Sequence, residues 1–489
     1  MNMKKIAYIA AGCLLLSANL LSGCDSFLDE APRGKAIATS VNEYNGMFNT
    51  TLFMNLSLSH DYYAFWRSDD LIFTPGCYSQ LDMNTFYGSS IKNAFQYKQE
   101  VYRGDQESSE WVEPYKQIYV FNSIVNGVMS ATGSEKEKLY LQSEARVSRA
   151  YMHFLLAQWF ALPYDESYAE TELTVPLVTE AETSVMNYRR ATMKEMYDFI
   201  TTEMEESCPN LEDRVDHRMR VYKPTGYGLM GKVYFLMGKY DKALTALRTA
   251  YELLPKSAAE VYLLDYNELM RPYGYRELTA DELYSDMDIL PYLFRSSQVL
   301  WCKQTTMMNS YYFVYGDQIT FYLNPEFYAL YDEYDLRRNL ICTVNREGTP
   351  LTYPYPGFLG NKINLGLNLP EVYLMLAECE ARVGSEDNAR QILADFRKYR
   401  VLPGHEEVPS SVTTKEDLIR FCVDELNREF MATGYRWYTV RRLWNDPLFQ
   451  DMKPVTHFDG EQTFTLDESG LKTAIPETVL EWNESWRGQ

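Results

Sequence analysis

The feature that most constrains the fold is a set of regularly spaced residues, several of them Gly or Ala, between positions 227 and 255. Its regularly placed members are Gly231, Tyr234, Gly238, Tyr240, Ala243, Leu247, Ala250 and Pro255. Small side chains at a helix crossing let two antiparallel helices approach closely, and a proline is expected to end the second helix. The segment therefore predicts a tightly packed helical hairpin.

These offsets match a tetratricopeptide repeat, and a second hairpin is predicted within residues 371–400. Ala377, Gly384, Ala389 and Leu393 repeat the same small-Gly-Ala-Leu spacing there. Apolar residues at three-to-four spacing predict further helices from Glu110 onward, over 135–161 and over 193–206. The expected fold is mainly α: a tetratricopeptide-like helical-hairpin scaffold with long irregular loop insertions and a few short strands.

Local signals place several element boundaries. Ser134 and Glu137 have the spacing of a capping box, which predicts that a helix begins between them. Val299–Trp301 is expected to form a short strand. Trp111 and Trp301 are interpreted as core residues.

Two long stretches, residues 61–109 and 256–370, are rich in Tyr, Asp, Asn, Gly and Pro. Loops of this length in a compact domain are usually functional surfaces. Aromatic rings stack on the C–H faces of sugars, while Asp, Asn and Arg bond sugar hydroxyls. The same side chains grip peptides, and the alternative is that these rings pack the loops onto the helices. The candidate ligand-binding residues are Tyr62, Tyr63, Trp66, Arg67, Asp69, Asp70, Tyr78, Tyr87, Tyr311, Tyr312 and Tyr315.

The first residues have the pattern of an export signal. Lys4 and Lys5 precede an apolar run over 6–16, which is too short for a permanent spanning helix. Leu21-Ser22-Gly23-Cys24 then resembles a bacterial lipobox, which is cut before its cysteine. We therefore expect residues 1–23 to be a lipoprotein signal peptide and Cys24 to carry the lipid that tethers the mature chain to a membrane.

The chain is strongly acidic, with a formal net charge of −21 over 489 residues. Phosphate backbones are bound by basic surfaces, so this charge argues against nucleic acid as a partner. Like-charge repulsion also disfavours polyanionic glycans, and the expected ligand is neutral. A hydrophobic content of 46% excludes disorder as the main state.

Motifs for cofactor, metal or catalytic chemistry are incomplete. The segment 226–232 contains both GxGxxG and GxxxxGK, but no apolar strand precedes it, and Val233 stands where a P-loop needs Ser or Thr. The histidines have no partner at metal-ligand spacing, no CxxC pair occurs, and Cys379 and Cys422 are interpreted as buried. Asp332 and Asp335 are expected to pair with the arginines that follow them. We predict no cofactor, no metal and no enzymatic activity.

Several blocks, in order along the chain, resemble the SusD/RagB family of outer-membrane nutrient-binding lipoproteins. They are Trp111–Asn122, Tyr140–Arg146 with Arg149, Glu371–Ala381 with Gly384 and 389–400, Leu426–Phe430 with Gly434–Trp437 and Arg441, and Ile475-Pro476 with Asn483. Two departures occur at scaffold positions. The usual acidic residue of the fourth block is displaced to Glu425, and Ala432-Thr433 replaces the usual Phe-Glu.

The resemblance implies a surface lipoprotein of the outer membrane that binds oligosaccharide and passes it to a SusC-type TonB-dependent transporter. It also implies three regions: the signal over 1–23, an N-terminal helical-hairpin region over 24–255, and a C-terminal region over 256–489. The last would carry the loop-rich ligand face and a helical block over 370–445. A peptide or glycoconjugate ligand is the alternative within the family, and a secreted glycan-active hydrolase is the alternative outside it.

Overall fold

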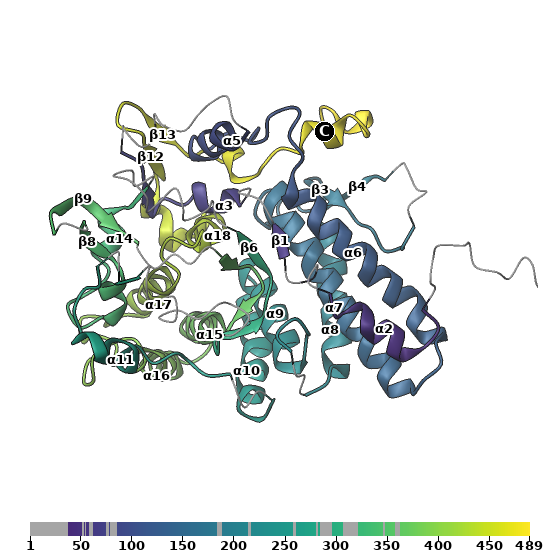
Figure 1. Ribbon diagram of the computed structural model, residues 1–489, viewed down its shortest axis with the longest axis horizontal. Coiled ribbons are helices and arrows are strands. Elements are labelled where there is room, and N and C mark those ends of the chain that lie inside the picture. Colours follow the sequence, from purple (N-terminus) through teal and green to yellow (C-terminus); the bar gives the residue numbers. More distant parts are fainter. Residues whose placement is uncertain are drawn as a thin grey trace, which may run out of the picture.

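Packed helix pairs form the body of the molecule (Figure 1). The computed structural model describes residues 38–489 apart from 51–52, 54, 58–61, 75–77, 79–85, 183–187, 214–216, 258–260, 280–281, 284–295, 307–320, 346–347 and 357–361. The longer helices of the first half are α2 (Val41–Met47), α5 (Phe86–Phe95), α6 (Ser109–Gly127), α7 (Glu135–Phe160), α8 (Met193–Ser207), α9 (Lys223–Leu236) and α10 (Tyr240–Ser257). Those of the second half are α15 (Leu369–Val383), α16 (Glu386–Arg397), α17 (Lys415–Glu429) and α18 (Tyr435–Leu443).

Helices that follow one another in the chain also pack on one another in space. Helix α6 packs on α7, α7 on α8, α9 on α10, and α15 on both α16 and α17. Contact between α10 and α15 joins the two halves of the helical array. The shorter helices are α3 (Tyr63–Trp66), α11 (Tyr266–Met270), α14 (Pro325–Tyr328) and α19 (Glu477–Leu480). The predicted mainly α fold is confirmed.

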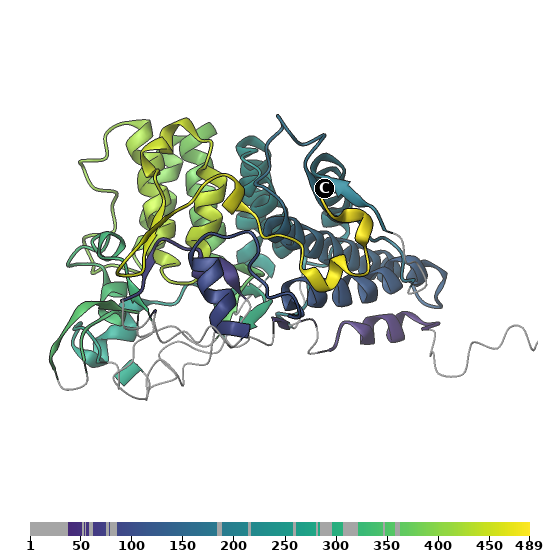
Figure 2. The ribbon, with the colours of Figure 1, turned by 90° about the horizontal axis from the view of Figure 1, so that it is seen from above.

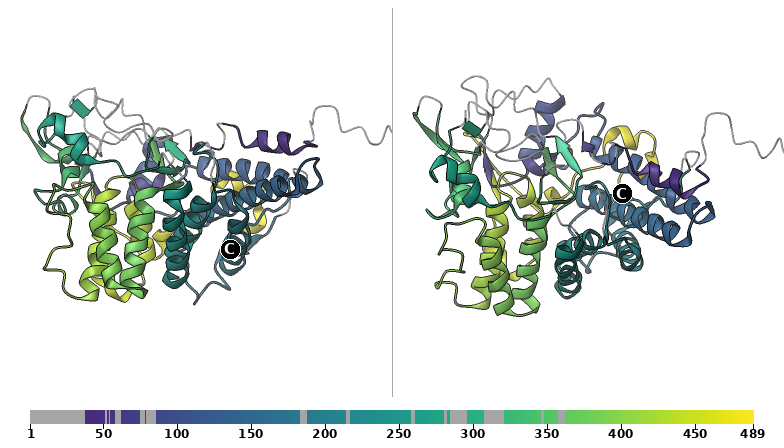
Figure 3. Two further views of the ribbon diagram at one scale, coloured as in Figure 1. Left: turned by 90° about the horizontal axis from the view of Figure 1, so that it is seen from below. Right: turned by 60° about the horizontal axis from the view of Figure 1, so that its bottom comes forward.

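Short strands tie distant segments together. Strands β1 (Asn55–Ser57), β6 (Gln304–Thr306) and β10 (Lys362–Asn364) form one sheet, with β1 parallel and β10 antiparallel to β6. The two-stranded pairs are β2 (Leu71–Ile72) with β7 (Tyr322–Leu323), β3 (Leu173–Pro176) with β4 (Arg190–Thr192), β5 (Val299–Trp301) with β11 (Leu367–Asn368), β8 (Cys342–Val344) with β9 (Pro350–Tyr355), and β12 (Thr456–Phe458) with β13 (Thr463–Thr465). The strand predicted over Val299–Trp301 is confirmed. Figures 2 and 3 show the green strands around residues 299–368 gathered at one end of the helices.

The α9–α10 hairpin confirms the predicted close helix crossing. A Cβ atom on Gly231 would lie 2.6 Å from Cγ of Leu247, and one on Gly228 would lie 2.5 Å from Cδ2 of Leu367. The glycines of the GxGxxG pattern therefore serve helix packing. The prediction that Pro255 ends the second helix is wrong, because α10 continues to Ser257. Proline lacks its own N–H but allows the next residues to keep helical dihedral angles.

Side-chain caps begin the two helices that were predicted next. The Ser134 hydroxyl accepts from the Glu137 amide at 3.2 Å ahead of α7, and Thr192 and Glu195 form a reciprocal capping box ahead of α8. Both helices end within one residue of the predicted position.

Buried side chains form one large cluster that runs from Val41 to Trp486. It includes Trp111, Cys379 and Cys422, as predicted. The predicted ion pair between Asp335 and Arg337 is present at 2.7 Å and is buried. Among the described helices, none is both long and apolar enough to cross a membrane.

Helix α3 is buried because the start of α18 lies directly against it. Gly434 has φ +79°, and a Cβ there would lie 2.8 Å from Cε1 of Tyr62 and 2.9 Å from the Phe65 nitrogen. Only glycine combines this left-handed dihedral with so close an approach. The turn between α17 and α18 therefore fixes α3 in the core.

Asp70 also binds the turn between α17 and α18. Its Oδ2 atom accepts from the Ala432 amide at 2.8 Å, and Ala432 has φ +52°. The side chain is 1% exposed, and its Oδ1 atom has no hydrogen-bond partner among the described residues. Burial raises the pKa of Asp70 to about 7, because the ionised form has lost its hydration.

The glycine crossing gives a stability prediction. We expect Gly231→Ala to lower the free energy of unfolding by about 1–3 kcal/mol, because the new methyl group overlaps Leu247. Gly46→Ala is the matched control: it also lies in a helix, and no atom lies within 4 Å of the added Cβ. Urea denaturation of both variants measures the difference, and equal stabilities would contradict the close crossing.

Asp70 gives a pH prediction. Its folded pKa of about 7 lies above the unfolded value near 3.8, so the folded state holds the proton more tightly. Stability attributable to Asp70 is therefore lost as the pH rises from about 4 to 7, by up to about 4 kcal/mol. Asp70→Asn stays neutral, so its stability relative to the parent should grow across this window in thermal melts.

Asp69→Asn is the control for that experiment. Asp69 forms an ion pair with Arg436, with N–O distances of 2.8 and 3.0 Å, so its loss should destabilise the protein at neutral pH. Opposite signs for the two adjacent substitutions are the expected outcome. A destabilising Asp70→Asn at pH 8 would refute the burial argument.

Candidate functional site

Five of the predicted ligand-binding residues lie in the core. Each is at most 2% exposed, and they are Tyr62, Tyr63, Trp66, Arg67 and Asp70. A side chain that is covered by its own protein cannot contact a ligand at the surface. The prediction for these five is therefore corrected: the rings pack the first long loop onto the helices, which was the alternative.

Their contacts show what they support instead. Trp66 stacks on Phe73 with ring centroids 5.8 Å apart and meets Phe321 edge-on at the same distance. The Tyr63 hydroxyl accepts from Nε2 of Gln106 at 3.1 Å. Trp66 therefore packs on rings that flank the β2–β7 strand pair, because Phe73 follows β2 and Phe321 precedes β7.

Arg67 is a buried cation held by carbonyl groups. Its guanidinium donates to the carbonyl oxygens of Gly470 and Lys98 and lies 5.4 Å from the ring centroid of Trp437. Burial, with a further contribution from the nearby charge of Arg441, lowers the pKa of Arg67 to about 10, so the group stays charged at neutral pH. Its role is to join the first loop to the C-terminal segment.

Two further candidates lie nearer to solvent. Asp69 is partly exposed and is occupied by its bidentate ion pair with Arg436. Tyr78 is half-buried: its hydroxyl accepts from Nε2 of Gln96 at 2.7 Å, and Nζ of Lys92 lies 4.9 Å from its ring centroid. Burial raises the pKa of Tyr78, so its hydroxyl keeps its proton and can donate to a ligand.

The remaining predictions concern positions that the structure does not describe. Cys24, Tyr311, Tyr312 and Tyr315 lie outside the described residues. Tyr87 lies in α5, but its side chain is also outside them.

Half-buried tyrosines surround the β2–β7 pair and form what we call the aromatic face. Its members are Tyr78, Tyr322, Tyr328 and Tyr353. The rings of Tyr322 on β7 and Tyr353 on β9 meet at a centroid distance of 5.9 Å and an angle of 62°. Ile72 pairs with Tyr322 across the strands, and the Tyr78 ring contacts Phe73, which follows β2, with centroids 5.8 Å apart. Sequence reasoning named only Tyr78 of these four tyrosines, and the sequence of β9, Pro-Leu-Thr-Tyr-Pro-Tyr, carries no alternation that would have located Tyr353.

Polar groups accompany these rings. Nε of Arg338 donates to the Tyr328 hydroxyl at 3.0 Å and its guanidinium lies 5.3 Å from the ring centroid. Asn324 caps α14, which begins beside β7, and its amide nitrogen donates to the Asp69 carbonyl at 3.1 Å. Rings with hydrogen-bonding groups at their edges suit ligands that have both apolar faces and hydroxyls.

Side chains that could take part in acid–base or metal chemistry are buried or scattered among the described residues. His153 is fully buried: its Nε2 atom accepts from the Val178 amide at 3.2 Å, and burial lowers its pKa to about 3. Among the described residues, no group of three His, Cys, Asp or Glu side chains is placed to hold a metal ion.

Comparisons with known proteins agree with this architecture. Residues 38–235 match a family described as starch-binding and associating with the outer membrane, and residues 360–484 match the SusD family. Comparison with curated proteins found no significant match.

Solved structures with the same fold cover almost the whole chain. A SusD superfamily protein from Bacteroides fragilis is 17% identical, with a TM-score of 0.65 over 92% of this chain and 100% of that one. One from Bacteroides thetaiotaomicron is 18% identical, with a TM-score of 0.65 over 91% and 98%. A laminarin-binding SusD-like protein is 17% identical, with a TM-score of 0.59 over 91% and 98%. The ordered sequence blocks, the helical-hairpin fold and the two family matches together show that this chain belongs to the SusD/RagB family.

Proposed function

We propose that this protein is an outer-membrane, surface-exposed lipoprotein that binds a neutral oligosaccharide and passes it to a SusC-type TonB-dependent transporter. Membership of a family described as starch-binding and associated with the outer membrane supports the ligand class and the location. The observation that carries the proposal is the aromatic face, where the half-buried rings of Tyr322 and Tyr353 adjoin each other.

The chemistry of the aromatic face fits a sugar chain. Successive pyranose units expose flat C–H surfaces, which pack on tyrosine rings and need little reorganisation when the rings are already fixed. The cations of Arg338 and Lys92 lie over one face of the Tyr328 and Tyr78 rings and can bond sugar hydroxyls beside those rings. Tyr87, Tyr311, Tyr312 and Tyr315 remain proposed ligand contacts.

The role is binding without catalysis, and the chain uses its own lipid as anchor. Cys24 stands at the end of the lipobox, so it is the proposed lipidation site, with residues 1–23 removed. The acidic residues that follow it closely, such as Asp25 and Asp29, are compatible with export to the outer face.

Affinity for an oligosaccharide panel tests the ligand. We expect Tyr322→Ala with Tyr353→Ala to weaken binding of the best oligosaccharide by about tenfold or more in isothermal titration calorimetry, because stacking area is lost. Tyr119→Ala is the control, since Tyr119 is an exposed tyrosine on α6, away from the aromatic face. Laminarin oligosaccharides belong in the panel because a structural neighbour binds laminarin.

The same experiment separates the alternatives. Titration of a peptide and glycopeptide panel would reveal the other ligand class of the family, and product analysis after long incubation with polysaccharide would reveal a hydrolase. Heat release with peptides alone, or sugar products that disappear when one carboxylate is replaced, would each overturn the proposal.

Lipidation and transport are tested in a Bacteroidetes host. Cys24→Ser should leave the full chain unanchored and abolish incorporation of labelled palmitate, because the thioether site is gone. Cys13→Ser changes a cysteine within residues 1–23 and should alter neither anchoring nor palmitate incorporation. Affinity purification of the anchored protein should also recover a large outer-membrane barrel, and its consistent absence would reject the transporter role.

A further inference from the structure

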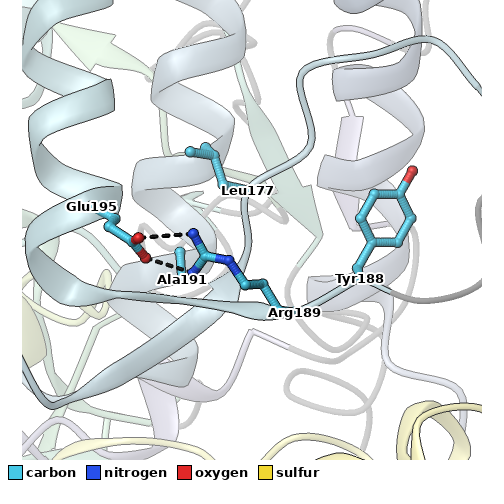
Figure 4. Close-up of a pocket in the computed structure, with 5 residues that line it drawn as sticks. All are labelled: Leu177, Tyr188, Arg189, Ala191 and Glu195. Carbon is cyan, nitrogen blue, oxygen red and sulfur yellow. Dashed lines mark hydrogen bonds and ion pairs between the residues drawn. The ribbon is translucent and has the colours of Figure 1, made fainter.

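A pocket separate from the aromatic face lies between the β3–β4 pair and the start of α8. Its volume is about 310 Å³, and it is lined by Leu177, Tyr188, Arg189, Ala191 and Glu195 (Figure 4). Figure 1 places β3 and β4 on the opposite side of the molecule from β8, β9 and α14. This volume stands at the lower end of the range for small-molecule sites, so one sugar unit fits better than a longer chain.

The pocket has an apolar part and a polar part. In Figure 4, Leu177 and Ala191 lie next to the Arg189–Glu195 pair, and the Tyr188 ring lies apart from these four residues. Arg189 and Glu195 form a bidentate pair, with Nη1–Oε2 and Nη2–Oε1 distances of 2.7 and 2.8 Å. The pair has no net charge, which favours a neutral ligand.

The polar part is held in place before any ligand arrives. Oε2 of Glu195 also accepts from the Thr192 amide at 2.9 Å, as the capping box of α8 requires. The hydrogen bonds from Arg189 and this amide keep the pKa of Glu195 near 2, so the carboxylate is ionised at neutral pH. These bonds use three of the four lone-pair positions of the carboxylate, and the fourth, on Oε1, can accept from a hydroxyl group without moving the side chain.

Hydrogen bonds also hold the backbone at Tyr188. The Tyr188 carbonyl accepts from Nε1 of Trp486 at 3.2 Å, which attaches this position to the C-terminal segment. The next residues are fixed by Arg190, which donates to the carbonyl oxygens of Leu173 and Thr174, both at 2.7 Å. Because the Tyr188 ring and the Arg189–Glu195 pair line the same pocket, the ring can receive the C–H face of a pyranose while the pair bonds its hydroxyls.

We propose that this pocket is a second binding site, for a single neutral pyranose unit, with Tyr188 stacking on the sugar ring and Glu195 and Arg189 bonding its hydroxyls. The site goes beyond the proposed function, because it is separate from the aromatic face. It would let the protein hold one branch or one end of a glycan independently of the main ligand contact.

Saturation-transfer NMR with methyl pyranosides of glucose, galactose and mannose tests this on the mature chain. We expect saturation of the pyranose C–H protons for at least one of them, about tenfold weaker binding in Tyr188→Ala, and near-parental binding in Tyr188→Phe, which keeps the ring. Glu195→Gln should weaken binding while its amide oxygen still caps α8. Methyl glucuronide, which is charged, should bind no better than its neutral counterpart.

Substitutions at one site should leave binding at the other site unchanged. The double variant at Tyr322 and Tyr353 should keep the methyl pyranoside signal, and Tyr188→Ala should keep the oligosaccharide affinity measured by calorimetry. Absence of saturation with every methyl pyranoside, or an equal signal in Tyr188→Ala and the parent, would overturn the pocket proposal and leave the proposed function intact. Thermal melts verify that each variant is folded.

Discussion

The buried carboxylate of Glu425 is the interaction on which the rest of this structure depends. It is fully buried and accepts from Arg337 at 2.6 Å, Arg397 at 3.0 Å and Arg428 at 2.7 Å. Burial alone would raise the pKa of Glu425, but the three guanidinium groups hold it well below its usual range. Because a buried cation that loses its partner is strongly destabilising, these bonds commit α16, α17 and the Arg337 segment to one arrangement. Helix α17 then sets the turn that Asp70 and Gly434 hold against α3.

The abundance of tyrosine has a different explanation from the one that composition suggests. Many of these side chains are internal ties that bury a ring and use the hydroxyl to satisfy a carbonyl group. The Tyr151 hydroxyl donates to the Leu365 carbonyl at 2.7 Å, and the Tyr331 hydroxyl donates to the Arg428 carbonyl at 2.6 Å. Both join segments far apart in the chain. Others, such as Tyr322 and Tyr353, are half-buried and keep part of the ring at the surface, where a ligand can meet it.

Local patterns predicted the scaffold because each helix carries its own signals. The small residues around Gly231, the cap at Ser134 and the ordered family blocks located the hairpins to within about two residues. The site residues were predicted less well. Tyr62, Tyr63 and Trp66 have the composition of a ligand-binding loop, yet α18 covers them. Nothing within residues 62–70 signals that a segment more than 350 positions later will pack on it.

The sequence by itself determined the helical-hairpin scaffold, the acidic character and the family, and it predicts the export and lipidation signals. These depend on spacing and composition within short segments, which the chain carries whatever its tertiary fold. Only the tertiary structure decided which aromatic rings are covered and which remain available, and that Arg189 and Glu195 line one pocket with Tyr188. Exposure is a property of what lies on top of a side chain, and here the covering elements come from distant parts of the chain.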